Sequence, residues 1–141
     1  MKKLLLLLSF LASQLLSVEC TQEQYKPYFD KNNDRYMTSA WQQHDLSPIT
    51  VDKKSIVYDK ENQKIVCWLF GQVKNLPNYG IVKMEREFNI NTKQTRLLST
   101  IILDCEGYTL GQSSQGKLES ISPESVNEVV FNSIKKYLNI K

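Results

Sequence analysis

Hydrophobic and polar positions follow three different patterns along the 141 residues of the chain. Residues 4–16 are almost all apolar, and a pair of lysines precedes them. From Trp41 to about residue 112, short β-branched and aromatic runs are separated by polar turns, which is typical of β-strands. After Ser122, apolar residues recur at helical spacing. The pattern therefore predicts a leader, a β-sheet and a C-terminal helix, in this order.

The β-like region contains six segments with the character of strands. The run 64–73 (KIVCWLFGQV) is apolar at both odd and even positions, which predicts a central strand that is covered on both faces. The run 81–90 (IVKMEREFNI) alternates more cleanly between apolar and charged residues. Because short turns join these runs, we expect one antiparallel, meander-like sheet of about five to six strands. The segments are 49–52, 55–59, 64–73, 81–90, 95–104 and 107–112.

The C-terminal segment has the features of an amphipathic helix. Ser122 is suited to cap it, Pro123 to its first turn, and Glu124 to the positive end of the helix dipole. The fold class that we expect is therefore α+β, with this helix packed on one face of the sheet. The predicted apolar stripe comprises Val126, Val129, Val130, Ile134, Tyr137 and Leu138.

The N-terminal pattern predicts a secretory signal peptide over residues 1–20. Its apolar run is shorter than the ~18 residues that a membrane-spanning helix needs. We therefore expect an exported protein with no transmembrane segment after removal of the leader. The polar residues 21–40 are expected to form a flexible N-terminal arm, and residues 41–141 one domain.

Cys20 lies at the end of this leader and has three alternative fates: lipid attachment, disulfide formation, or removal with the leader. The preceding residues, Ser17 to Glu19, do not favour lipidation, because an acidic side chain directly before the cysteine is unsuited to the lipoprotein peptidase. Ordinary signal peptidase could cut after Cys20 or after Ser17. We expect soluble release into the periplasm or to the cell surface rather than a lipid anchor.

The composition does not favour a nucleic-acid ligand. Removal of residues 1–20 takes away two lysines and one glutamate, so the formal charge changes from +3 to 3 − 2 + 1 = +2. No run of basic residues is longer than a pair, whereas a nucleic-acid site needs a clustered basic face.

The sequence also gives little support for catalysis or metal binding. His44 is the only histidine, and no recognised motif surrounds it. The run from Asp30 to Asp34 has the spacing of a calcium loop, but Arg35 and Trp41 occupy the positions that need glycine and glutamate. We therefore expect a protein that is not an enzyme and that needs neither a metal nor another cofactor.

The order of these segments resembles that of the surface-adhesin E family, named for a small outer-membrane adhesin of Gram-negative bacteria. The similarity covers about 100 residues, through ITVDKKSIVYDKENQKIVCWLF, VKMEREFNINTKQTRLLS and ISPESVNEVVFNSIKKYL. Members of the family usually have a cysteine after the aromatic residue of the EFNI segment and another in the final helix. In the family, these two cysteines tether the helix to the sheet. Here Ile90 occupies the first position and the helix has no cysteine, so this tether between helix and sheet is absent.

Cys67 and Cys105 remain as a further candidate pair, since exported proteins favour disulfides. In a meander, however, their strands would lie on either side of 81–90, about 9.6 Å apart, and a bridge needs Cα atoms within roughly 7 Å. We therefore expect two buried thiols.

These observations favour an exported, non-catalytic binding module. The resemblance implies an adhesin that contacts host matrix or plasma proteins; the alternative is a periplasmic accessory or inhibitor protein that acts on an envelope enzyme. Tyr79 and Tyr108, in turn-rich segments, are candidate contact residues. Arg86 shares the apolar face of its strand and could pair with Glu124 or Glu128 or recognise a ligand between helix and sheet. Unpaired sheet edges also suggest a homodimer.

Overall fold

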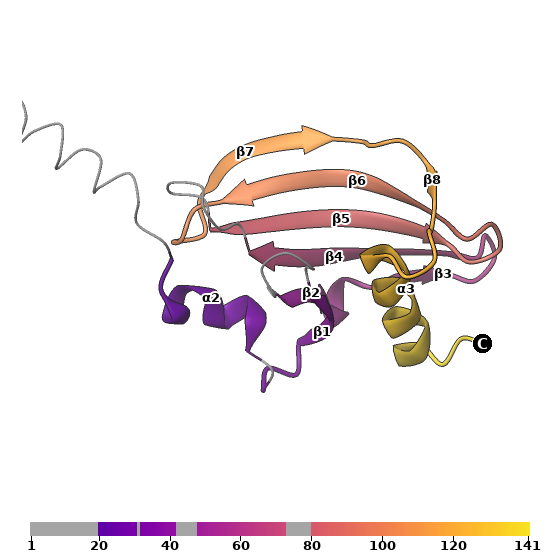
Figure 1. The fold of residues 1–141 in the computed structure, drawn as a ribbon, viewed down its shortest axis with the longest axis horizontal. Coiled ribbons are helices and arrows are strands. Elements are labelled where there is room, and N and C mark those ends of the chain that lie inside the picture. Colours follow the sequence, from indigo (N-terminus) through magenta and orange to yellow (C-terminus); the bar gives the residue numbers. More distant parts are fainter. Residues whose placement is uncertain (1–19, 31, 42–47, 73–79) are drawn as a thin grey trace, which may run out of the picture.

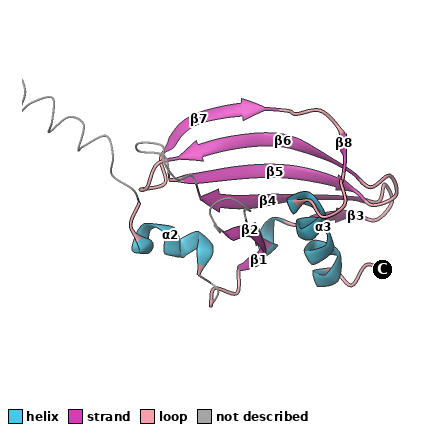
Figure 2. Cartoon of the chain, viewed as in Figure 1, coloured by secondary structure: helices cyan, strands magenta, loops and turns pink. Residues whose placement is uncertain are grey.

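The computed structural model describes residues 20–141, except for residue 31 and residues 42–47 and 73–79. In this part of the chain, eight strands form one antiparallel sheet, and the two α-helices lie against it near opposite ends (Figure 1). The fold class is therefore α+β, as expected (Figure 2). The helical elements are α2 (Gln22–Phe29), the short 3₁₀ helix η1 (Lys53–Ser55) and α3 (Val126–Tyr137). The strands are β1 (Tyr36–Trp41), β2 (Pro48–Asp52), β3 (Val57–Asp59), β4 (Lys64–Gln72), β5 (Ile81–Asn89), β6 (Gln94–Leu103), β7 (Thr109–Ser114) and β8 (Glu119–Ser120).

The sheet has the order β1-β2-β4-β5-β6-β7, with β3 paired to β4 and β8 paired to β6. Strands β4 to β7 are consecutive neighbours, so the predicted meander is confirmed. The six predicted strands are all present, and the two additional strands are β1 and the two-residue β8.

Strand β4 is the central strand that its composition predicted. Its odd-numbered residues, from Ile65 to Leu69, belong to a core cluster that includes Phe88 of β5 and the apolar face of α3. Because side chains alternate along a strand, Trp68 and Phe70 point to the opposite face, where they pack with residues of α2. The sheet therefore has two separate hydrophobic cores, one on each face.

Helix α3 closes the first core, but it begins three residues later than predicted. Ser125, and not Ser122, is the N-cap, because its side chain accepts a hydrogen bond from the backbone N–H of Glu128 at 3.2 Å. Pro123 and Glu124 belong to the preceding turn, in which Glu124 has a positive φ of 60°.

The buried side of α3 also differs from the predicted stripe. Val130, Phe131 and Ile134 are buried, and the ring of Phe131 stacks on that of Phe88 at 5.6 Å. Val129 and Tyr137 were expected in the stripe, but they are 44% and 46% exposed. The core contacts of α3 are made by Val130, Phe131 and Ile134, so Val129 and Tyr137 fall outside the buried stripe.

The expected flexible arm over residues 21–40 is instead largely ordered secondary structure. Helix α2 starts with a capping box, in which Thr21 accepts from the backbone N–H of Gln24 and the Gln24 side chain accepts from that of Thr21. Tyr25 on this helix is buried in the second core. Strand β1 then adds an edge to the sheet beside β2. The polar composition of the segment concealed a short helix that is fixed by tertiary packing.

The helices of the described part are short. Helix α2 has 8 residues and α3 has 12, and neither has the length and apolar composition that would allow it to cross a membrane.

Candidate functional site

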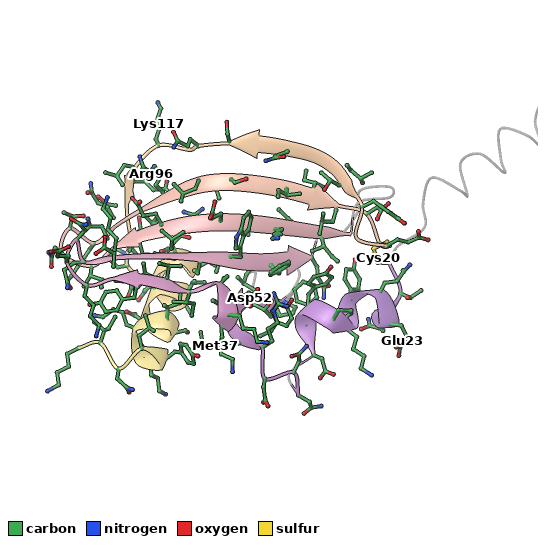
Figure 3. All side chains as sticks on the ribbon, turned by 180° about the vertical axis from the view of Figure 1, so that it is seen from behind. Cys20, Glu23, Met37, Asp52, Arg96 and Lys117 are labelled. Carbon is green, nitrogen blue, oxygen red and sulfur yellow. A yellow bond between two sulfur atoms is a disulfide. The ribbon has the colours of Figure 1, made fainter. Side chains whose placement is uncertain are left out.

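A cleft of about 360 Å³ opens on the face of the sheet that α3 does not cover. We call it the aromatic cleft. Helix α2 and strands β1, β2 and β4 to β7 contribute to its walls, together with the turns before β1 and between β6 and β7. Figure 3 shows Asp52, one of the lining residues, beside α2 on the view from behind. The lining residues are Tyr28, Arg35, Tyr36, Asp52, Phe70, Lys83, Ile101, Leu103, Gly107 and Thr109.

Three rings form an aromatic wall in this cleft: Tyr28, Tyr36 and Phe70. The ring of Tyr28 stacks on Phe70 with centroids 5.0 Å apart and an interplanar angle of 22°. Tyr36 meets Phe70 edge-on at 5.6 Å. The buried hydroxyl of Thr50 donates a hydrogen bond to the carbonyl oxygen of Tyr28 at 3.0 Å, which fixes the end of α2 against β2. The wall is therefore held by α2, β1 and β4 together.

An ion pair lies next to this wall. Arg35 donates from Nε and Nη2 to the two carboxylate oxygens of Asp52, at 3.0 and 2.7 Å. The backbone N–H of Lys54 also donates to Asp52, at 3.1 Å. Both oxygens of Asp52 are thus occupied, in the two-pronged geometry that makes an arginine–carboxylate pair strong.

The environment of Asp52 keeps it ionised. Desolvation acts to raise the pKa of this carboxyl, but the hydrogen bond and charge of Arg35, the Lys54 amide and the charge of Lys83 together lower the pKa below its usual value. Burial raises the pKa of the neighbouring Tyr36, whose hydroxyl therefore stays neutral. The ion pair therefore presents polar groups of fixed orientation at the edge of the aromatic wall.

Lys83 is the remaining charged group of the cleft. It lies between Phe70 and Ile101 in the sheet register, and its Nζ atom is 4.3 Å from the centroid of the Trp68 ring. The ring of Phe70 lies 5.9 Å from the same atom. Among the residues that the structure describes, no carboxylate forms an ion pair with Lys83. Lys83 thus lines the cleft, and its ammonium group lies over aromatic rings without a directly paired anion in this part of the chain.

The turn between β6 and β7 borders the cleft and carries the predicted contact residue Tyr108. Asp104 organises this turn, because its side chain accepts from the backbone N–H groups of Glu106 and Tyr108 at 2.9 and 2.8 Å. Gly107 occupies the left-handed region with a φ of 91°, where a side chain would be strained. Tyr108 itself is 69% exposed, so its side chain is accessible from solvent.

A disulfide closes the same end of the molecule. Cys20 is bonded to Cys105, with Cα atoms 5.2 Å apart, and it connects the start of α2 to the β6–β7 turn (Figure 3). The expectation that Cys67 and Cys105 do not pair is confirmed, but the expectation that Cys105 is a free thiol is wrong. The error arose because removal of residues 1–20 would discard the true partner.

Arg86 has a partner that sequence reasoning did not identify. Its side chain is 12% exposed, on the α3 side of the sheet, and its Nη1 atom lies 3.5 Å from Glu119 Oε1 and 3.3 Å from Thr95 Oγ1. The carboxylate that pairs with Arg86 is that of Glu119 and not that of Glu124 or Glu128, as was expected. The pairing of β8 with β6 places Glu119 opposite Thr95. Arg86 therefore anchors β8 and does not reach the aromatic cleft. Tyr79, the other predicted contact residue, is outside the described residues.

Most of the cleft residues were not among the sequence candidates. The capping box of Thr21 and Gln24 was a readable signal for α2, and a helix there places Tyr25, Tyr28 and Phe29 on one side. No comparable signal pointed to Lys83, whose importance depends on which rings the fold brings beneath it.

The described residues contain no group of three or more histidine, cysteine, aspartate or glutamate side chains placed to hold a metal ion. The glutamates at 85 and 87 share a strand face, and Glu87 forms ion pairs with Arg96 at 3.2 Å and with Lys64 at 3.9 Å. These contacts give Glu87 a role in the charged face of the sheet.

Comparison of the sequence with protein-family models found no family that matches, and a search of curated proteins found no significant match.

Proposed function

We propose that this protein is an exported, non-catalytic binding module of the bacterial envelope that contacts a protein ligand. The observation that carries the proposal is the disulfide between Cys20 and Cys105, directly after a segment with the pattern of a signal peptide. Disulfides persist in oxidising compartments such as the periplasm and the cell surface.

The aromatic cleft supports a binding role. Its aromatic wall supplies apolar contact area, and the ion pair of Arg35 and Asp52 beside it adds polar groups of fixed orientation. Tyr108, in the turn that borders the cleft, is exposed, and tyrosines are frequent in protein interfaces. The resemblance to the surface-adhesin E family favours host matrix or plasma proteins as ligands. The fold alone does not select among ligands.

The position of Cys20 bears on how the leader is removed. A cut after Cys20 would separate the cysteine from Cys105, whereas a cut after Ser17 would retain it. We therefore propose cleavage before Cys20, with the sulfur used in the disulfide and not in a lipid anchor.

Two experiments test the proposal. The first separates the culture into medium, periplasm and membrane fractions and measures protease accessibility on intact cells. The second measures binding of the disulfide-bonded protein to purified matrix and plasma proteins at physiological salt. Surface accessibility with saturable binding supports the adhesin. Release from the periplasm without surface accessibility, together with binding to an envelope enzyme, supports the accessory or inhibitor protein instead. Cytoplasmic retention would refute both.

The expected homodimer is a separate proposal. It would use the outer edge of β7, which no other strand of the described residues covers. Sedimentation equilibrium at two protein concentrations tests it.

A further inference from the structure

The geometry points to Lys83 as the residue that recognises a carboxylate of the protein ligand inside the aromatic cleft. The apolar group next to that carboxylate would lie on the aromatic wall. This inference rests on the proposed function for the source of the carboxylate, and it adds the chemical class that the cleft selects.

The charge balance of the cleft is the first argument. Three charged side chains line it, and two of them, Arg35 and Asp52, neutralise each other through a two-pronged pair. All the hydrogen bonds that the structure gives to the Asp52 carboxylate come from Arg35 and the Lys54 amide. Lys83 is close enough to lower the pKa of Asp52 but forms no ion pair with it. The cleft therefore has one surplus positive charge, which favours an anionic group.

The position of Lys83 is the second argument. Its ammonium lies over the ring of Trp68 at 4.3 Å, a contact that holds the flexible lysine chain in place. A lysine that is already ordered loses less conformational entropy when it binds a ligand. The three N–H donors of its ammonium group can serve one carboxylate without rearrangement of the ion pair next to it.

The shape of the cleft is the third argument, because it selects a carboxylate with an apolar neighbour. The opening is bounded by the aromatic wall and by Ile101 and Leu103. A phosphate group would favour a free arginine fork or several cations, whereas the Arg35 fork is occupied and only Lys83 remains. The carboxylate can come from an acidic side chain or from the C-terminus of a peptide, and the two sources share this chemistry.

Small peptide probes test the inference directly. The disulfide-bonded protein, labelled with ¹⁵N, is titrated with acetyl-Asp-Phe-amide, acetyl-Ala-Phe with a free carboxyl end, and the neutral acetyl-Asn-Phe-amide. We expect at least one of the two acidic probes to shift the amide signals of Lys83 and Gly107, and to bind at least tenfold more tightly than the neutral probe. Binding by the first acidic probe alone identifies a side-chain carboxylate, and binding by the second alone a C-terminal one.

Three variants assign the effect to Lys83. Lys83→Gln should weaken the acidic probes about tenfold to hundredfold, the value of one hydrogen bond to a charged group. Lys83→Arg keeps the charge and should bind within about threefold of the wild type, which excludes simple loss of folding. Lys135→Gln is the matched control, because Lys135 also lies over a ring, that of Phe131 at 5.5 Å, but on the opposite face of the sheet. It should have no effect.

Several outcomes would overturn the inference. Equal affinity for the acidic and neutral probes would refute it, as would signal shifts confined to the α3 face. Unchanged binding of a protein ligand by Lys83→Gln would refute the inference while the proposed function stands. Conversely, if the acidic probes bind as expected but no matrix, plasma or envelope protein does, the chemistry of the cleft stands and the proposed function fails.

Discussion

Removal of the disulfide between Cys20 and Cys105 is the perturbation with the largest expected effect on stability. The two cysteines are 85 residues apart, so the bond closes a large loop and restricts the conformations of most of the unfolded chain. The loop-entropy relation gives about 4.5 kcal/mol for a loop of this size, and native disulfides usually contribute about 2–5 kcal/mol. Since a whole domain has a net stability of about 5–15 kcal/mol, the double variant Cys20→Ser/Cys105→Ser should lose roughly a third or more of its free energy of unfolding.

The loss should be concentrated in the second core. The disulfide holds the first turn of α2, and the hydrogen bond from Thr50 to the Tyr28 carbonyl holds its end. Without the covalent bond, a helix of 8 residues has little stability of its own. Hydrogen exchange should therefore accelerate in α2 before it accelerates in the strands beneath α3.

Urea unfolding, followed by tryptophan fluorescence, measures the effect on the oxidised protein, the reduced protein and the double variant. The reductant should destabilise the wild type and leave the double variant unchanged, which separates the loss of the bond from the effects of the serines. A change of less than about 1 kcal/mol on reduction would refute the argument from chain entropy. Detection of three free thiols in the denatured, unreduced protein would refute the pairing itself.

Further predictions concern the first core, the ion pair and the remaining thiol. Phe131→Ala should lower the free energy of unfolding by about 3–5 kcal/mol, because it removes a buried ring that stacks on Phe88. The control Val129→Ala, at an exposed position of the same helix, should change it by less than about 0.5 kcal/mol. Urea unfolding measures both values. The pKa of Asp52 is lower in the folded than in the unfolded protein, so the contribution of Asp52 to stability is present above the unfolded value of 3.8 and is lost as the pH falls through the folded value. Asp52→Asn should therefore reduce the loss of stability in acid, as measured by unfolding between pH 6 and pH 2. An unchanged pH profile of stability would contradict this assignment. Desolvation raises the pKa of Cys67 to about 12, so iodoacetamide at pH 8 should alkylate it only after denaturation, and rapid alkylation of the native protein would refute its burial.

The sheet was predictable because the apolar pattern of each strand reflects which of its faces are buried. The run 64–73 is apolar at both parities, and the structure covers β4 with a different core on each face. The alternation in 81–90 likewise placed Phe88 and Met84 toward the C-terminal helix. In each case the period of the hydrophobic pattern is a local property that the fold preserves.

The features that sequence reasoning missed depend on contacts between distant segments. Helix α2 is polar and contains Pro27, and its stability comes from the disulfide and from the stacking of Tyr28 on Phe70. The aromatic cleft combines residues from six strands, α2 and two turns, and no local pattern marks such a set. The predicted start of α3 was three residues too early because Ser122 and Ser125 are both suitable caps. In the structure Ser125 is the cap, and Glu124 before it has a positive φ that is not helical.

The pairing of Cys20 with Cys105 places a constraint on how the chain acquires its native disulfide during folding. On the export proposed above, translocation would deliver residues from the N-terminus onward, so Cys20 would encounter Cys67 before Cys105 has emerged. The native bond joins the first and the third cysteine, whereas Cys67 between them is buried in β4 once the sheet has formed. Oxidation that outpaces assembly of β4, β5 and β6 would trap a Cys20–Cys67 crosslink, and a thiol–disulfide isomerase would be needed to correct it. The yield of protein with the native disulfide should therefore depend on the rate of strand pairing relative to the rate of thiol oxidation.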